Sequence, residues 1–291
     1  MNDNIIDSHQ HFWQVGRFDY AWMSADNETL CRDYLPDDLE PILKDCGVRR
    51  SVLVQASNSL AETRWLLELA EHHEFIAGIV GWVDLRSPQV EEQIAAFASH
   101  PKFKGVRHLI ESEPADDWLV QPEVLRGLDA LASRGVAYDL LVHTRHLRHV
   151  LTVAERCPNL RLVIDHMAKP PIASGEINEW SREMKIVAQI PGLHCKLSGL
   201  VTEADHAQWT RAELTPYVEC ALEWFGPQRM MIGSDWPVCL LAASYDHALD
   251  AYRELLAGLN EHERQAILAD NAARFYRLRD DFSTDTGIQG I

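Results

Sequence analysis

The stretch Ile5-Ile6-Asp7-Ser8-His9-Gln10-His11-Phe12-Trp13 decides how the rest of the chain is interpreted. Its two opening isoleucines are typical of a buried strand. In extended backbone alternate side chains leave the same face, so His9 and His11 would project together. Two imidazoles arranged in this way can chelate a divalent metal through neutral ring nitrogens or donate to one substrate group. An isolated His-x-His pair is equally consistent with two unconnected histidines at a strand end, so the surrounding sequence has to decide.

Apolar segments recur along the chain after this first strand, and helical patterns separate them. The segments expected to form strands are 51–56, 76–85, 104–109, 137–142, 161–167, 193–199 and 229–235. Helices are expected from Pro36 to the residue before Gly47, after the capping box Ser59-x-x-Glu62, from Ser87-Pro88, and around 122–134, 146–156, 176–190 and 209–225. Strands spaced by roughly 25 to 35 residues, with a helix in each interval, are typical of repeated βα units.

Eight such units predict a single (β/α)8 barrel of the TIM type, with no domain boundary in residues 1–291. Two extra helices are expected after the eighth strand, at 244–257 and 261–270, and residues 280–291 are expected to be frayed. The competing architecture is a doubly wound open sheet, which usually has a glycine-rich turn after its first strand. Ser8-His9-Gln10-His11 occupies that position, which favours the barrel.

The composition narrows the functional classes. The chain has 44 acidic and 27 basic residues, and its net charge of −17 would repel nucleic acid and anionic membrane surfaces. A small neutral substrate is compatible with this charge, whereas an anionic one would need a local cluster of cations. The six cysteines show no C-x-x-C spacing, and neither a leader segment nor a bilayer-spanning apolar run is visible, so we expect a reduced, cytoplasmic protein. A homo-oligomer is compatible with the sequence, although no motif specifies one.

Polar residues gather where the predicted strands end. In a (β/α)8 barrel the chemistry lies at the carboxyl ends of the strands, so a polar residue at that position is a candidate for the active site. Nearly every strand of this chain supplies at least one: His9, His11, Gln55, Arg107, His108, His143, Asp165, His166, Lys169, Lys196, Ser198 and Asp235. Any one of them alone is more often structural, but their repetition at the same end of successive strands predicts a site.

Three neighbouring features are expected to be structural. Asp7 would anchor strand one by accepting backbone hydrogen bonds. Arg107 and His108 are adjacent, so strand alternation lets only one of them face the barrel mouth. The pair His72-His73 lies at a helix end, where the helix dipole favours a cation, and no catalytic role is expected for it.

Four motifs in chain order resemble the sugar-lactonase branch of the amidohydrolase superfamily. They are the opening stretch from Ile6 to Trp13, Asp165-His166-x-x-Lys169-Pro170, the run 195–200 and Gly233-Ser234-Asp235-Trp236-Pro237. Within that branch the chain resembles L-fuconolactonases and L-rhamnonolactonases most, and the runs 200–205 and 239–245 lean toward the first. The resemblance spans essentially the whole chain. It implies a hydrolase that opens an aldonolactone, an internal sugar ester, to the aldonic acid.

The resemblance also implies a metal site. Zinc is the expected ion, and four residues match the superfamily's ligands: His9, His11, His166 and Asp235. Binuclear members bridge two metals with a lysine or carboxylate at the end of strand four or five, where this chain has Arg107-His108 and His143. At most one divalent ion is therefore expected, and some relatives of this branch work without a metal.

Asp235 is expected to act as general base on a water molecule, because a carboxylate among cations stays ionised, and to pass the proton later to the leaving hydroxyl. The metal, or the strand-one histidines with His166, would hold the carbonyl oxygen as it gains negative charge. Five residues are expected to bind the lactone or the nascent carboxylate: Arg107, His108, Lys196, Trp236 and His143. Trp13 and Trp118 are further candidates for packing on the sugar ring.

Three alternatives share parts of this pattern. A pyrone-dicarboxylate lactonase would use the same residues but needs extra cations for two carboxylates. A metal-dependent aromatic-acid decarboxylase of the same superfamily would release carbon dioxide and leave sugar lactones intact. A catalytically silent sugar-binding barrel would not need the full set of His9, His11, His166 and Asp235.

Overall fold

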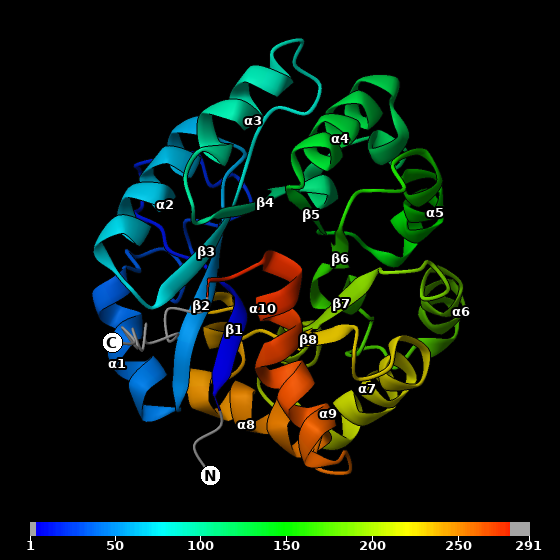
Figure 1. Cartoon of the computed structure of the whole chain (residues 1–291). Helices are drawn as coiled ribbons and strands as arrows, with labels where there is room; N and C mark the ends of the chain where they lie inside the picture. The colour runs from blue at the N-terminus through cyan, green and yellow to red at the C-terminus, as the bar shows by residue number, and fades with distance from the viewer. Residues whose placement is uncertain (1–3, 280–291) are drawn as a thin grey trace, which may run out of the picture.

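The computed structural model describes residues 4–279, and its strands form one parallel sheet in chain order. The strands are β1 (Ile5–Gln10), β2 (Val48–Val54), β3 (Ile76–Gly81), β4 (Phe103–His108), β5 (Ala137–Leu140), β6 (Leu162–Ile164), β7 (His194–Leu197) and β8 (Met230–Ile232). The sheet closes on itself, because the His11 N–H donates to Trp236 O at 2.7 Å and the Asp235 N–H donates to His9 O at 2.8 Å. The fold is the predicted (β/α)8 barrel (Figure 1), and the doubly wound alternative is wrong.

Helices follow the strands and form the outer ring (Figure 1). They are α1 (Pro36–Asp45), α2 (Leu60–His72), α3 (Val90–Ala98), α4 (Pro122–Arg134), α5 (Leu147–Arg156), α6 (Ile177–Val187), α7 (Arg211–Phe225) and α8 (Tyr245–Leu255). The local sequence sets where several of these helices begin and end. Pro36 is the first residue of α1, and the Ser59 hydroxyl caps α2 by accepting from the Glu62 N–H at 3.2 Å. Gly135 ends α4 in a left-handed backbone conformation. Short 3-10 turns lie in the loops at Ile110–Ser112, Trp118–Val120, Thr144–His146, Val201–Glu203 and Val238–Leu241.

All seven strands predicted after the first end earlier than the sequence suggests, and for two of them the structure shows the cause. The segment 76–85 leaves the sheet after Gly81, because the Thr63 hydroxyl bonds both the N–H and the carbonyl oxygen of Trp82. The segment 161–167 leaves it after Ile164, because left-handed backbone begins at His166. In both places the apolar sequence continues beyond the strand, so hydrophobicity alone overestimates its length.

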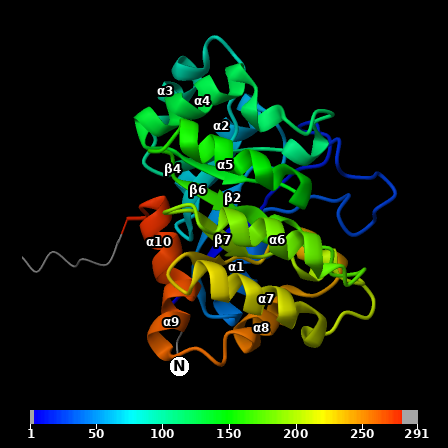
Figure 2. The ribbon, with the colours of Figure 1, turned by 90° about the vertical axis from the view of Figure 1, so that its right-hand side faces the viewer.

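The barrel is closed at the end where its strands begin by three consecutive helical segments: α9 (Glu261–Gln265), a π-helical turn (Ala266–Asp270) and α10 (Asn271–Tyr276). The sequence predicts the first two as one helix and misses α10. Phe275 and Tyr276 belong to the same buried cluster as Ile6 and Val163 of the sheet. Figure 2 shows α9 and α10 on the opposite side of the barrel from the long loop after β1, so the mouth is at the other end.

Two further expectations concern redox state and membranes. The six cysteines are all free, and Cys157, Cys195 and Cys239 are buried. Within residues 4–279 we find no helix with the length and apolar character that a bilayer crossing needs. The expectation that residues 280–291 are frayed lies outside the described residues.

Candidate active site

Strand β1 carries the two histidines into the barrel mouth, and Asp7 fixes its position. The Asp7 carboxylate accepts hydrogen bonds from the backbone N–H groups of His9 at 3.1 Å and Ser234 at 2.9 Å. It also accepts from the hydroxyls of Ser234 and Tyr245. These bonds confirm the structural role expected for Asp7, and they tie the strand that carries His9 to the loop that carries Asp235.

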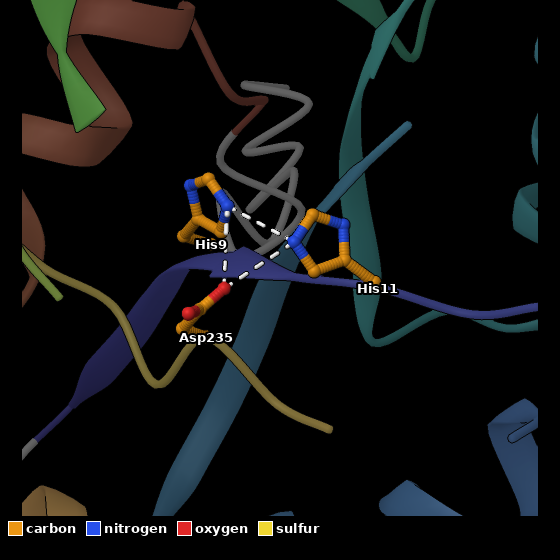
Figure 3. A group of neighbouring side chains, drawn as sticks. All are labelled: His9, His11 and Asp235. Atoms are coloured by element: carbon orange, nitrogen blue, oxygen red, sulfur yellow. Dashed lines mark hydrogen bonds and ion pairs between the residues drawn. The ribbon is translucent and has the colours of Figure 1, made fainter. Parts of the chain in front are cut away.

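Three of the predicted residues meet at the base of the mouth, as Figure 3 shows. His9 Nε2 lies 3.1 Å from His11 Nε2, and Asp235 Oδ1 lies 3.7 Å from the first nitrogen and 3.4 Å from the second. His166 Nε2 approaches the same carboxylate oxygen to 3.8 Å. All four side chains are buried. The fold therefore brings together residues at or just beyond the ends of three different strands, β1, β6 and β8.

Outer partners orient two of the imidazoles toward Asp235. The His11 Nδ1–H donates to Val54 O at 2.8 Å, so its Nε2 faces the carboxylate. His166 Nδ1 lies 2.9 Å from the Ser198 hydroxyl oxygen, and its Nε2 likewise faces Asp235. Burial lowers the pKa of both imidazoles, against the opposing effect of Asp235. Both rings are therefore biased toward the neutral form at neutral pH.

His9 has a cation at each ring nitrogen. Lys196 Nζ lies 3.1 Å from Nδ1, and Arg107 Nη1 lies 3.2 Å from Nε2. Burial lowers the pKa of His9 well below its ordinary value, and the charge of Lys196 lowers it further, although Asp165 acts in the opposite direction. A third positive charge between two cations is unfavourable, so His9 is held neutral and can accept or ligate through a lone pair.

Asp235 is the carboxylate on which these groups converge. Burial alone would raise the pKa of its carboxyl group, but the interactions with His166, His11 and His9 together lower the pKa far below the ordinary value. Asp235 therefore stays ionised at neutral pH, as a general base requires.

Gly199 makes room for this arrangement. Its φ is +64°, and a Cβ at this position would lie 2.5 Å from His166 Nδ1 and 3.2 Å from Asp235 Oδ2. Both the backbone conformation and the space around it exclude a side chain. The close packing of His166 and Asp235 therefore requires a glycine at position 199.

A left-handed turn carries His166 and Lys169 into the mouth. Residues 166–169 all have φ between 51° and 59°, a conformation that costs roughly 1–2 kcal/mol per non-glycine residue. The Lys169 N–H donates to His166 O at 2.8 Å and closes the turn. The His166 ring then faces Asp235, while the Lys169 ammonium pairs with Glu111.

Strand alternation separates Arg107 from His108, as the sequence predicts. Arg107 faces the mouth, where its guanidinium donates to Gln55 Oε1 at 2.9 Å and to Asp165 Oδ2 at 3.3 Å. His108 packs behind the strand, with its ring stacked on Trp118 at 3.9 Å between centroids. Of the two, only Arg107 lines the pocket.

Lys196, predicted to bind the substrate, lies below the pocket rather than in it. The side chain is fully buried, and its Nζ is 2.6 Å from Asp139 Oδ2 and 2.9 Å from Asp165 Oδ1. It is the penultimate residue of β7, one position before the strand end, so it projects into the barrel interior. Its contact with the site runs through His9.

The tryptophans expected near the sugar lie in the core instead. Trp13, Trp118 and Trp236 are at most 1% exposed, and none of them lines the pocket. Trp22, which the sequence interpretation did not select, does line it, and its indole N–H donates to Ala56 O at 2.7 Å. The one feature of the sequence that could have indicated Trp22 is its position in the aromatic-rich segment that follows β1.

The pocket above the cluster encloses about 520 Å³, counted to its open mouth. Its lining combines predicted residues with others that the sequence interpretation did not assign to the site: His11, Arg107, His166, Lys169, Gly199 and Asp235, with Trp22, Ala56, Leu109, Glu111, Leu141, Thr202, Glu203 and Val238. The sequence does not predict Glu111 and Glu203 as site residues, because each lies on a 3-10 turn inside a loop and not at a strand end. His143 is outside the lining, with its Nε2 3.6 Å from Glu111.

The donor set fits one divalent ion. Ligand atoms lie within 4.8 Å of one another in two overlapping groups, which are His9 with His11 and Asp235, and His9 with Asp165 and His166. Imidazole nitrogen and carboxylate oxygen are ligands that zinc accepts, and outer hydrogen bonds such as the one from His11 to a backbone carbonyl are typical of ligating histidines. Because both groups share His9, they describe one site and not two.

Known proteins with similar sequences and folds share this barrel. An L-fucono-1,5-lactonase from Burkholderia ambifaria is 43% identical over 278 residues, which cover 94% of this chain and 95% of that protein. An L-fucono-1,5-lactonase from Burkholderia multivorans is 41% identical over 285 residues, with 94% and 96% covered. The crystal structure of an amidohydrolase from Burkholderia multivorans with bound zinc matches with a TM-score of 0.91 at 39% identity, over 95% of this chain and 100% of that one. Because the match to the amidohydrolase family extends over residues 6–278, the chain belongs to that family.

Proposed function

We propose that this protein is a lactonase that opens an L-aldonolactone, with L-fuconolactone as the lead substrate. The observation that carries the proposal is the ionised Asp235 carboxylate, which lies among three imidazoles at the base of an open pocket. The names of two relatives that exceed 40% identity over nearly their full length support the substrate class.

Asp235 acts as the general base. A water molecule gives a proton to the carboxylate while its oxygen forms a bond to the lactone carbonyl carbon. The bond between that carbon and the ring oxygen then breaks. Asp235 returns the proton to the ring oxygen, which becomes a hydroxyl of the open aldonic acid.

Arg107 and His166 line the same pocket and stabilise the carbonyl oxygen as it gains negative charge. Arg107 is well suited to this role because Gln55 and Asp165 hold its guanidinium in place before the substrate arrives. A zinc ion held by His9, His11 and Asp235 would supply Lewis-acid polarisation of the same oxygen.

The charge of the pocket favours a neutral substrate. Three carboxylates line it, those of Asp235, Glu111 and Glu203, against the cations Arg107 and Lys169. Lys169 is paired with Glu111, and Arg107 already bonds to three neighbouring side chains, those of Gln55, Asp165 and His9. This balance disfavours a pyrone dicarboxylate, which would bring two negative charges. It also repels the aldonate product, which helps its release.

A pH-indicator assay of the purified protein against L- and D-aldonolactones tests the proposal. We expect L-fuconolactone and L-galactonolactone to be opened at comparable rates, because their rings share stereochemistry, and D-gluconolactone to be much slower. Chelator-treated protein is assayed in parallel to separate the contribution of a metal from that of Asp235. If no lactone is opened faster than in buffer alone, the lactonase proposal fails. A preference for D-gluconolactone or for an anionic pyrone would overturn the substrate class only.

A further inference from the structure

The pocket presents two chemically different walls. In a closed ring of eight strands in chain order, β2 lies across the barrel from β6, and β3 lies across from β7. Trp22 is held beside Ala56, just after β2, and so stands across the mouth from the loops after β6 and β7. Those loops carry Lys169, Thr202 and Glu203 into the pocket. A bound ligand therefore meets an apolar surface on one side and a polar surface on the other.

Glu203 differs from the other two carboxylates of the pocket in having no partner. Glu111 is paired with Lys169, and Asp235 contacts three histidines. No hydrogen bond or ion pair joins the Glu203 carboxylate to another side chain in the described part of the chain. Burial raises the pKa of this carboxyl group, Lys169 opposes the effect, and the negative charges of Glu111 and Asp235 raise the pKa further. The side chain is half-buried and lines the pocket, so a ligand can reach its oxygens.

The backbone nevertheless holds Glu203 firmly in place. Its N–H donates to Leu200 O at 3.1 Å, and its carbonyl oxygen accepts from the Ala173 N–H at 2.9 Å. These bonds tie the loop after β7 to the loop after β6. A carboxylate on a backbone fixed in this way can select a ligand, because little loop freedom remains to be lost on binding.

We infer that Glu203 recognises two adjacent hydroxyl groups of the lactone, and this inference rests on the proposed function. A carboxylate offers two acceptor oxygens and no donor when ionised, which matches a vicinal diol, and hydrogen bonds to a charged acceptor are the stronger kind. An anionic substituent at the same place would be repelled. Glu203 is therefore a specificity-determining residue that selects polyhydroxy lactones over lactones that lack the diol.

Two variants and a series of substrates test the inference. Glu203→Gln keeps the shape of the side chain without its charge, and Glu203→Ala removes both acceptors. Glu176→Gln, in an exposed glutamate just before α6, is the matched control. Values of kcat/KM are measured for L-fuconolactone and for its monodeoxy analogues, and an analogue that is not turned over is measured as a competitive inhibitor. Thermal unfolding of each variant checks the fold.

We expect Glu203→Ala to lower kcat/KM for L-fuconolactone by about 10- to 150-fold, the effect of hydrogen bonds to a charged group, and the Gln variant to lose less. For each of the two analogues that lack one of the recognised hydroxyls, the same substitution should cost only about 3- to 12-fold, because one of the two hydrogen bonds is already absent. An equal loss on every analogue, or no loss on L-fuconolactone, overturns the inference. Wild-type protein that opens no lactone would instead overturn the proposed function.

Discussion

At the scale of single residues, the buried aspartates Asp7 and Asp235 differ in their surroundings. Asp7 accepts hydrogen bonds from neutral backbone and hydroxyl groups, and burial still raises the pKa of its carboxyl group. Asp235 is equally buried, but the histidines around it lower its pKa far below the usual value. Of these two aspartates, only Asp235 has a pKa that is lowered in spite of burial, which is why it is the reactive one in our proposal.

The first prediction is that Asp235→Asn abolishes turnover and leaves the fold intact. The amide keeps the shape of the side chain but takes no proton from water, and general base catalysis contributes typically about 10²–10⁴-fold. The measurement is kcat/KM on L-fuconolactone, with circular dichroism as the check of folding. A variant that retains more than about a tenth of wild-type activity would remove Asp235 from the base role.

The second prediction is that each chain holds at most one divalent ion tightly. His9 belongs to both groups of candidate ligands, so the two groups compete for one ion. Elemental analysis of protein purified without added metal gives the stoichiometry, and His11→Ala should bind zinc more weakly in a titration. Two equivalents per chain in the wild-type protein would contradict this prediction.

At the scale of structural elements, two connections do most to place the reactive groups: the left-handed turn at 166–169 after β6 and Gly199 after β7. Both connections have positive φ angles, whereas a strand has an extended backbone with negative φ. They bring the His166 ring and the Asp235 carboxylate into one small volume, where a Cβ on residue 199 would collide with the ring. The geometry of the site therefore depends on loops and not on strands alone.

The third prediction concerns this close approach. Gly199→Ala should displace His166 and lower kcat/KM by about 10²-fold or more, because misplacement of reacting groups by about 1 Å costs on that order. Gly175→Ala is the control, since Gly175 also has a positive φ, +70°, but no atom would lie within 4 Å of its Cβ. Both variants share the backbone penalty, so the difference in activity isolates the collision. Equal activity in the two variants would mean that His166 adjusts freely.

At the scale of the whole molecule, a buried polar chain links the closed end of the barrel to the site. The Tyr276 hydroxyl on α10 donates to Asp139 Oδ2 at 2.6 Å, and Lys196 joins Asp139 to Asp165. Lys196 Nζ then reaches His9. Helix α10, which closes one end of the barrel, is therefore connected to His9 through Tyr276, Asp139 and Lys196.

The fourth prediction follows from the burial of that network. Lys196→Met leaves the buried carboxylate of Asp139 without a cation and Asp165 with Arg107 alone, and should lower the free energy of unfolding by roughly 3–5 kcal/mol. Tyr276→Phe removes one hydrogen bond and should cost only about 0.5–1.5 kcal/mol. Urea denaturation of both variants measures the difference. If the two variants were equally stable, the lysine would not be the group that neutralises the carboxylates.

The sequence by itself determined the barrel and the central cluster. Alternating apolar segments and helical patterns specify eight βα units, and a closed parallel barrel must bring the carboxyl ends of its strands to one face. Residues at the predicted strand ends, such as His9, His11, His166 and Asp235, therefore had to meet. Topology brings them to the same end of the barrel, and the loops then set their contacts.

Only the tertiary structure decided which residues form the walls of the pocket. Trp22, Glu111 and Glu203 lie in loops, whose paths are set by packing against other loops and not by a sequence period. Lys196 falls one residue short of its strand end, so the length of β7 places it beneath the pocket rather than in it. Strand ends are fixed by which backbone groups find partners in the folded chain, and that information does not reside in any local stretch of sequence.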